Sequence, residues 1–102
     1  MIGLLKSQRE AIAELCKRHG VARLHAFGSA LRSDFDSDQS DLDLLVEFAT
    51  MEPYARVNAY FILLEELRQL LNRKIDLVMV GAVKNPYIAR DIERTKQVLY
   101  AA

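Results

Sequence analysis

Three aspartates and a Gly-Ser pair are the residues of this chain whose types and spacing could do chemistry. Asp41 and Asp43 open the apolar segment LDLLVEF, and two carboxylates separated by one strand residue point to the same face, about 7 Å apart. Such a pair can hold hard cations. Gly28 and Ser29 follow an earlier apolar run, where a turn would offer backbone amides and a hydroxyl to phosphate oxygens. This segment therefore predicts a site for metal and phosphate.

The third aspartate, Asp76, lies inside the otherwise apolar segment IDLVMV. An unpaired buried charge would cost several kcal/mol there, so this carboxylate needs a partner. Taken alone, it is as readily explained by pairing with Arg73, Lys74 or a backbone amide. With Asp41 and Asp43 on a neighbouring strand, it would complete a cage for one or two Mg²⁺ ions. Two such ions could activate an attacking hydroxyl and stabilise a leaving pyrophosphate, so the predicted reaction is phosphoryl or nucleotidyl transfer.

The remaining acidic residues of the loop do not form a calcium site. Read as an EF-hand from Asp34, the loop would place Gln39 where the turn glycine belongs and Leu45 where the final glutamate belongs. We therefore interpret Asp34, Asp36 and Asp38 as turn formers on a solvated loop.

Several other polar residues have an ordinary structural explanation beside a functional one. Ser29 could cap a short helix, or use the same geometry to bind a phosphate. Arg32 could add a cation near those phosphates or pair with the acidic loop. His25 falls inside a predicted strand, where a packed histidine is the commoner case. Glu47 shares a face with Asp43 but is expected to lie too far along the strand to reach the metals.

The elements that must position these residues follow from the hydrophobic periodicity. A possible capping box of Ser7 and Glu10 starts the first helix, which Ile2 to Lys6 could extend, and Gly20 stops it. Pro86 starts the last helix, which precedes the apolar tail VLYAA. In chain order we expect a helix at 7–19, strands at 21–27 and 42–48, a helix at 54–72, a strand at 75–80 and a helix at 86–97.

Composition narrows the class of protein. The 102 residues suffice for one domain, 1–102, with an α+β (α/β-like) fold in which helices flank a small sheet. A formal net charge of zero gives no direct evidence for nucleic acid as a partner, and no apolar stretch is long enough for a membrane span. The single cysteine, Cys16, cannot form an internal disulfide. Because a signal-peptide pattern is absent, we expect a cytoplasmic protein.

The arrangement Gly28-Ser29, Asp41-Leu42-Asp43 and a lone Asp76 on a later strand resembles the nucleotidyltransferases of the DNA polymerase β superfamily. Within it, the small size and the segments LDLLVEF and PYIARDIERTKQVLYAA resemble the minimal nucleotidyltransferases, the MNT group. The resemblance implies a mixed sheet with the site at one edge and ATP or another NTP as donor. It also implies two Mg²⁺ ions held by the three aspartates, and Ser29 as the phosphate contact.

The MNT resemblance further implies a partner. Members of this group are commonly encoded beside a HEPN-domain toxin and bind it as antitoxins, in some cases transferring AMP to a tyrosine of the toxin. The resemblance therefore implies AMPylation of a HEPN toxin within a complex of the two proteins. We expect no additional domain for tRNA, DNA or an antibiotic, which favours an acceptor supplied by a partner protein. Two alternatives stay open: an antitoxin that neutralises by binding alone, and transfer to a small molecule.

Overall fold

The computed structural model describes residues 2–28 and 42–102. Its helices and strands follow in the order α1 (Ile2–Ser7), α2 (Arg9–Arg18), β1 (Val21–Ala26), β2 (Leu42–Phe48), α3 (Pro53–Leu71), β3 (Ile75–Met79), α4 (Pro86–Thr95) and β4 (Gln97–Ala101). The short helix expected after Ser29 lies outside the described residues. None of the described helices combines the length and the apolar character that crossing a membrane requires.

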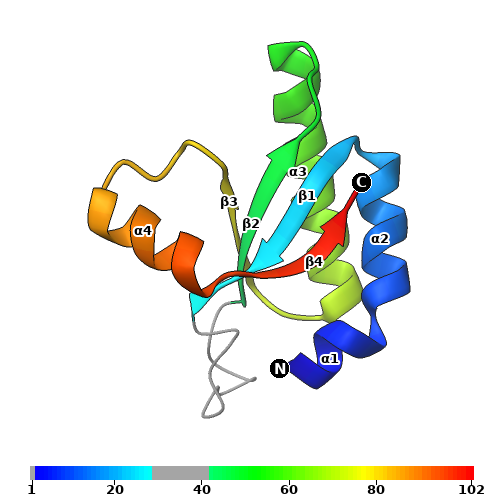
Figure 1. The fold of residues 1–102 in the computed structure, drawn as a ribbon. Coiled ribbons are helices and arrows are strands. Elements are labelled where there is room, and N and C mark those ends of the chain that lie inside the picture. Colours follow the sequence, from blue (N-terminus) through cyan, green and yellow to red (C-terminus); the bar gives the residue numbers. More distant parts are fainter. Residues whose placement is uncertain (1, 29–41) are drawn as a thin grey trace.

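The four strands form one mixed sheet in the order β3-β2-β1-β4 (Figure 1). β2 pairs in parallel with β3, whereas β1 pairs antiparallel with both β2 and β4. The parallel pair is connected through α3, because parallel neighbours need a long crossover connection. This mixed sheet with flanking helices confirms the expected α+β fold.

Helices α2 and α3 cover one face of the sheet and build the core with it (Figure 1). Alternate residues of β2, namely Leu42, Leu44 and Val46, belong to this core and are fully buried. Each such side chain contributes about 1.5 to 3 kcal/mol through burial of apolar surface. The core also contains Ile12 and Cys16 of α2, Leu24 of β1, Leu63, Leu67 and Leu71 of α3, and Leu77 of β3.

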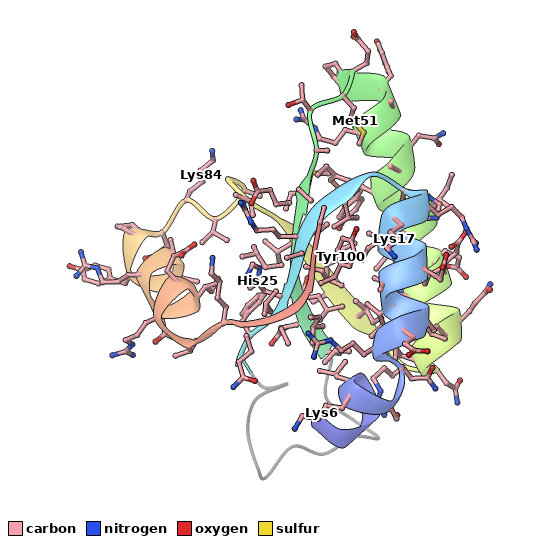
Figure 2. The ribbon with its side chains drawn as sticks, turned by 45° about the vertical axis from the view of Figure 1, so that its right-hand side comes forward. Lys6, Lys17, His25, Met51, Lys84 and Tyr100 are labelled. Atoms are coloured by element: carbon pink, nitrogen blue, oxygen red, sulfur yellow. The ribbon has the colours of Figure 1, made fainter. Side chains whose placement is uncertain are left out.

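The opposite face of the sheet is only partly covered, by α4 (Figure 1). Pro86 begins this helix as expected, and the side chain of Asn85 caps it by accepting hydrogen bonds from the backbone N–H groups of Tyr87 and Ile88 at 2.9 and 3.4 Å. Ile92 is the one buried residue of α4. Figure 2 shows His25 on the side of the sheet that faces α4, and Tyr100 on the side that faces α2.

The first helix differs from the sequence prediction. Two helices occupy the N-terminal region, and α2 begins after Gln8 without any side-chain cap, so the capping box of Ser7 and Glu10 is wrong. The break between the two helices lies at Gln8, between the end of α1 at Ser7 and the start of α2 at Arg9. The predicted stop at Gly20 is confirmed, because this residue has a φ of +71° that glycine adopts without strain.

The C-terminal tail also differs from the prediction. The last helix ends at Thr95 rather than near Gln97, and Lys96 already has extended ψ of 147°. Residues Gln97–Ala101 then form β4 against β1. The backbone groups along the edge of β1 must be paired, and the β-branched and aromatic side chains of this tail suit a strand. The tail is therefore a fourth strand, and it turns β1 from an edge strand into an inner one.

Candidate active site

Asp43 and Asp76 lie side by side on the partly open face of the sheet. They are Cα partners in the parallel register of β2 and β3, between the pairs Leu42 with Ile75 and Leu44 with Leu77. Both alternate with buried core residues, so their side chains point away from α2 and α3. This register brings the aspartate of the later strand next to Asp43, as the sequence led us to expect, while Asp41 lies outside the described residues. Two adjacent carboxylates offer the hard oxygen ligands that Mg²⁺ prefers.

The turn after β1 lies against Asp43. The backbone N–H of Phe27 donates to the carbonyl oxygen of Asp43 at 3.1 Å, which fixes the end of β1 beside the start of β2. Gly28 follows with a φ of +62°. A Cβ atom at this position would lie 2.6 Å from Oδ2 of Asp43, closer than real Cβ atoms approach an oxygen. Glycine is therefore required here twice, by its backbone conformation and by the carboxylate against it.

The surroundings of the two carboxylates differ from the expectation in one respect. Asp76 is exposed, and its side chain forms no hydrogen bond or ion pair within the described ranges 2–28 and 42–102. The expectation that it needs a partner to offset burial was wrong, because an exposed carboxylate stays hydrated. Pairing with Arg73 or Lys74 does not explain its presence on the strand. Asp43 is half-buried beside Gly28.

Part of the sequence-predicted site cannot be placed. Ser29, Arg32 and Asp41 lie outside the described residues, as do the acidic loop residues from Asp34 to Asp38. Among the residues that are described, no group of three or more histidine, cysteine or acidic side chains could hold a metal ion. A three-carboxylate cage therefore requires Asp41 in addition to the pair that the structure brings together.

Two further polar residues of this face, Glu47 of β2 and His25 of β1, lie farther along the sheet than Asp43. Glu47 forms an ion pair with Arg23, with 2.8 Å between Oε1 and Nη1. Glu47 lies four positions after Asp43 on the strand, a distance of about 13 Å, which agrees with its expected exclusion from the metal site.

His25 faces Leu45 across the pairing of β1 and β2. Partial burial lowers the pKa of His25 below 6.5, and Lys96 and Arg23 lower it further while Glu93 and Glu47 oppose them. This shift favours the neutral imidazole at pH 7. Its half-buried position inside an inner strand agrees with the packed histidine expected from the sequence.

Sequence reasoning missed two features of this site. It treated Gly28 only as a phosphate contact and did not anticipate its contact with Asp43. The available signal was a glycine directly after an apolar run, which marks a close approach of other atoms. It also missed β4, which makes β1 an inner strand and brings Val98 opposite His25.

Comparison with known proteins decides the family. The family model described as a nucleotidyltransferase domain matches residues 8–99. The chain belongs to this nucleotidyltransferase family. Protein adenylyltransferase MntA of Thermococcus cleftensis is 39% identical over 88 residues, which cover 85% of this chain and 81% of that protein. The recognised family and the enzyme class, a nucleotidyltransferase, are thereby confirmed.

Solved structures agree with the family assignment. This nucleotidyltransferase resembles the solved structure of a minimal nucleotidyltransferase with a TM-score of 0.75 and 32% sequence identity. The match covers 91% of this chain and 90% of the chain in that structure. A chain in the complex of the tri-AMPylated Shewanella oneidensis HEPN toxin with its MNT antitoxin gives a TM-score of 0.63 at 20% identity, covering 96% of this chain and 73% of that one. The second similarity shows a shared fold.

Proposed function

We propose that this nucleotidyltransferase is a cytoplasmic antitoxin that transfers AMP from ATP to a tyrosine of a partner HEPN toxin and so neutralises it. The observation that carries the proposal is the pairing of Asp43 and Asp76 on one face, beside the turn at Gly28. The similarity to protein adenylyltransferase MntA supports a protein acceptor. The fold shared with the chain from the tri-AMPylated toxin complex supports the HEPN partner.

The proposed reaction is a displacement at the α-phosphorus of ATP. The acceptor oxygen forms a bond to this phosphorus, the bond from phosphorus to the bridging oxygen breaks, and pyrophosphate leaves with the bond electrons. Asp76 is exposed at the reaction face and accepts the proton of the attacking hydroxyl. Gly28, Ser29 and Arg32 would bind the phosphates.

Asp41, Asp43 and Asp76 would hold Mg²⁺. Asp43 and Asp76 in register, together with Asp41 two residues before Asp43 in the sequence, fit an oxygen-ligated ion that keeps sites for substrate phosphates. Bound there, the metal would supply positive charge to the phosphates during transfer. The chain's own contribution is to orient Asp43 and Asp76 on two neighbouring strands, with Gly28 leaving the space that Asp43 occupies.

The test is to mix the purified protein with α-labelled ATP, Mg²⁺ and the HEPN protein encoded beside its gene. We expect label on the HEPN protein, located on a tyrosine by mass spectrometry, and no label when a chelator removes Mg²⁺. The double substitution Asp41→Ala with Asp43→Ala should abolish transfer while leaving the thermal midpoint unchanged or higher, since it removes like charges. A stable complex that blocks toxicity without any label would instead support neutralisation by binding alone.

A further inference from the structure

A hollow of about 190 Å³ lies between α4 and the sheet, and we call it the α4 hollow. Leu45 of β2 and Ile92 of α4 are buried in its walls, at 5% and 6% exposure, and Ala89 lines it one turn before Ile92. Val80 and Val83, from the segment between β3 and α4, add to the apolar lining. Within α4, all of whose residues are described, only Ile92 is buried. The helix therefore covers the sheet without filling the space beneath it.

The α4 hollow lies on the face of the sheet that carries the two carboxylates. Leu45 comes two residues after Asp43 on β2, so both side chains point to the same face, about 7 Å apart along the strand. Val78, the register partner of Leu45, follows Asp76 by the same two residues on β3. Figure 2 shows His25, which pairs with Leu45 from β1, on the side of the sheet that faces α4. The wall at Leu45 is thus one strand repeat from the candidate active site.

The carboxylates lie between the α4 hollow and the turn that would bind the phosphates. Phe27 and Gly28 of this turn contact Asp43 near the start of β2. Leu45 lies in the other direction from Asp43, farther along β2. In a displacement at phosphorus, the attacking and leaving oxygens lie roughly in line on opposite sides of the phosphorus. If the turn holds the leaving pyrophosphate, the attacking hydroxyl approaches from the side of the α4 hollow.

The size and the lining of the α4 hollow suit one aromatic ring. A cavity of about 150 Å³ with apolar walls is large enough to hold benzene. Among the described residues that line the hollow, Glu93 alone is charged, and its Oε1 pairs with Nζ of Lys96 at 2.8 Å. This ion pair offers no net positive charge to a phosphate. The apolar walls offer the contacts through which an aromatic ring is buried.

We propose that the α4 hollow receives the ring of the acceptor tyrosine. The ring packs between Leu45 and Ile92, and its hydroxyl points along β2 toward Asp43 and Asp76. Tyrosine carries its hydroxyl on the far edge of the ring, whereas the short side chains of serine and threonine would leave the apolar walls uncovered. The hollow thus selects tyrosine and holds its oxygen near the reacting phosphorus. This inference rests on the proposed function, because it assigns the acceptor pocket of the same site.

The test fills the α4 hollow from two different walls. Ala89→Phe enlarges a half-buried side chain of α4, and Val83→Phe enlarges one in the segment before it, so a failure of one variant to fold leaves the other as a test. Ala11→Phe is the matched control, because Ala11 is also half-buried on a helix and lines a hollow on the opposite side of the sheet. Thermal midpoints report folding. The measurements are kcat and KM of label transfer to the intact HEPN partner, and KM for ATP.

We expect Ala89→Phe and Val83→Phe to lower kcat/KM for the HEPN partner at least tenfold, with KM for ATP within twofold of wild type. Ala89→Ser, which leaves the hollow open, and the control Ala11→Phe should keep kcat/KM within twofold of wild type. Folded variants with a filled hollow and an unchanged kcat/KM would overturn the inference. So would a rise in KM for ATP with unchanged kinetics toward the partner, since the hollow would then hold the adenine base.

A binding measurement on the wild-type protein separates this inference from the proposed function. N-acetyl-tyrosinamide at millimolar concentration should shift the backbone amide NMR signals of Val83, Ala89 and Glu93, whereas N-acetyl-serinamide should not. Ala89→Phe should abolish these shifts. Absence of the shifts in the wild-type protein would overturn the tyrosine pocket, even where label reaches the HEPN partner. If the shifts appear but the HEPN partner never gains label, the transfer reaction is wrong and the pocket stands.

Discussion

The two faces of strand β2 have opposite properties although their residues alternate along one segment. Leu42, Leu44 and Val46 are completely buried against the helices. Asp43 and Glu47 on the other face are partly exposed, and Asp43 lies beside Asp76 of the next strand. One face therefore contributes to stability and the other to the proposed chemistry. A single-residue shift in register would exchange the two, so the core itself fixes which carboxylates meet.

The contrast between the faces predicts that substitutions on one face lower stability and substitutions on the other lower the transfer activity. A change on the helix-covered face should lower the free energy of unfolding and leave each folded molecule active. A change on the open face should lower transfer and leave stability almost unaltered. The following substitutions test this separation, beginning with the largest expected effect.

Leu44→Ala should have the largest effect on stability. The side chain is fully buried between the sheet and the helices, so its removal leaves a cavity and should cost about 2 to 5 kcal/mol. Urea denaturation followed by circular dichroism measures this loss. Transfer per folded molecule should stay within twofold of wild type at low temperature. A loss of activity that exceeds the unfolded fraction would show that the two faces are coupled.

Gly28→Ala should affect transfer more than stability. The new Cβ would lie 2.6 Å from Oδ2 of Asp43 and force that carboxylate to move. We expect transfer to fall at least roughly tenfold, while the left-handed backbone costs only about 1 to 2 kcal/mol. Gly20→Ala is the matched control, because Gly20 also has positive φ but its neighbour is the flexible end of Met51. Equal losses of transfer in the two variants would remove any specific role of Gly28 at the site.

Tyr60→Phe should have a smaller effect, limited to stability. The Tyr60 hydroxyl donates a 2.6 Å hydrogen bond to the carbonyl oxygen of Leu77 on the edge strand β3. Its loss should lower the free energy of unfolding by about 1 kcal/mol without changing kcat. Tyr87→Phe, at an exposed position of α4, should leave the free energy of unfolding within about 0.5 kcal/mol of wild type.

The smallest expected effect is a change in how the free energy of unfolding depends on pH, to which His25 contributes. Its pKa is lowered in the folded protein by burial first and by Lys96 second, with Arg23 acting in the same direction and Glu93 and Glu47 against it. The unfolded state therefore takes up its proton first as the pH falls, and the stability that His25 contributes above pH 6.5 is lost below that value. His25→Gln should reduce the fall in the free energy of unfolding between pH 7 and 5. A steeper fall of the free energy of unfolding in the variant would contradict the lowered pKa of His25 in the folded protein.

The sequence predicted the elements that carry strong periodicity. The long helix was expected at 54–72 and found at Pro53–Leu71, and the strand of LDLLVEF was found at Leu42–Phe48. Both depend on local apolar spacing that the sequence displays directly. The juxtaposition of Asp43 and Asp76 was also anticipated, because each carboxylate lies in an apolar segment that predicts a strand of the same small sheet.

Two features could not be predicted from local sequence. The strand at Gln97–Ala101 forms because β1 offers an unpaired edge, which depends on the sheet and not on the tail. The clearance between Gly28 and Asp43 involves residues separated by the whole loop.

The double-mutant cycle of Asp43→Asn and Asp76→Asn tests the central claim most directly, through the rate of AMP transfer to the HEPN partner. If the two carboxylates act as one unit, each substitution should reduce the rate by roughly a thousandfold, about 4 kcal/mol in the barrier. The double variant should then be scarcely slower than either single one. Asp76→Asn with wild-type transfer, or two losses that simply multiply, would contradict the assignment of these paired carboxylates as one reaction centre.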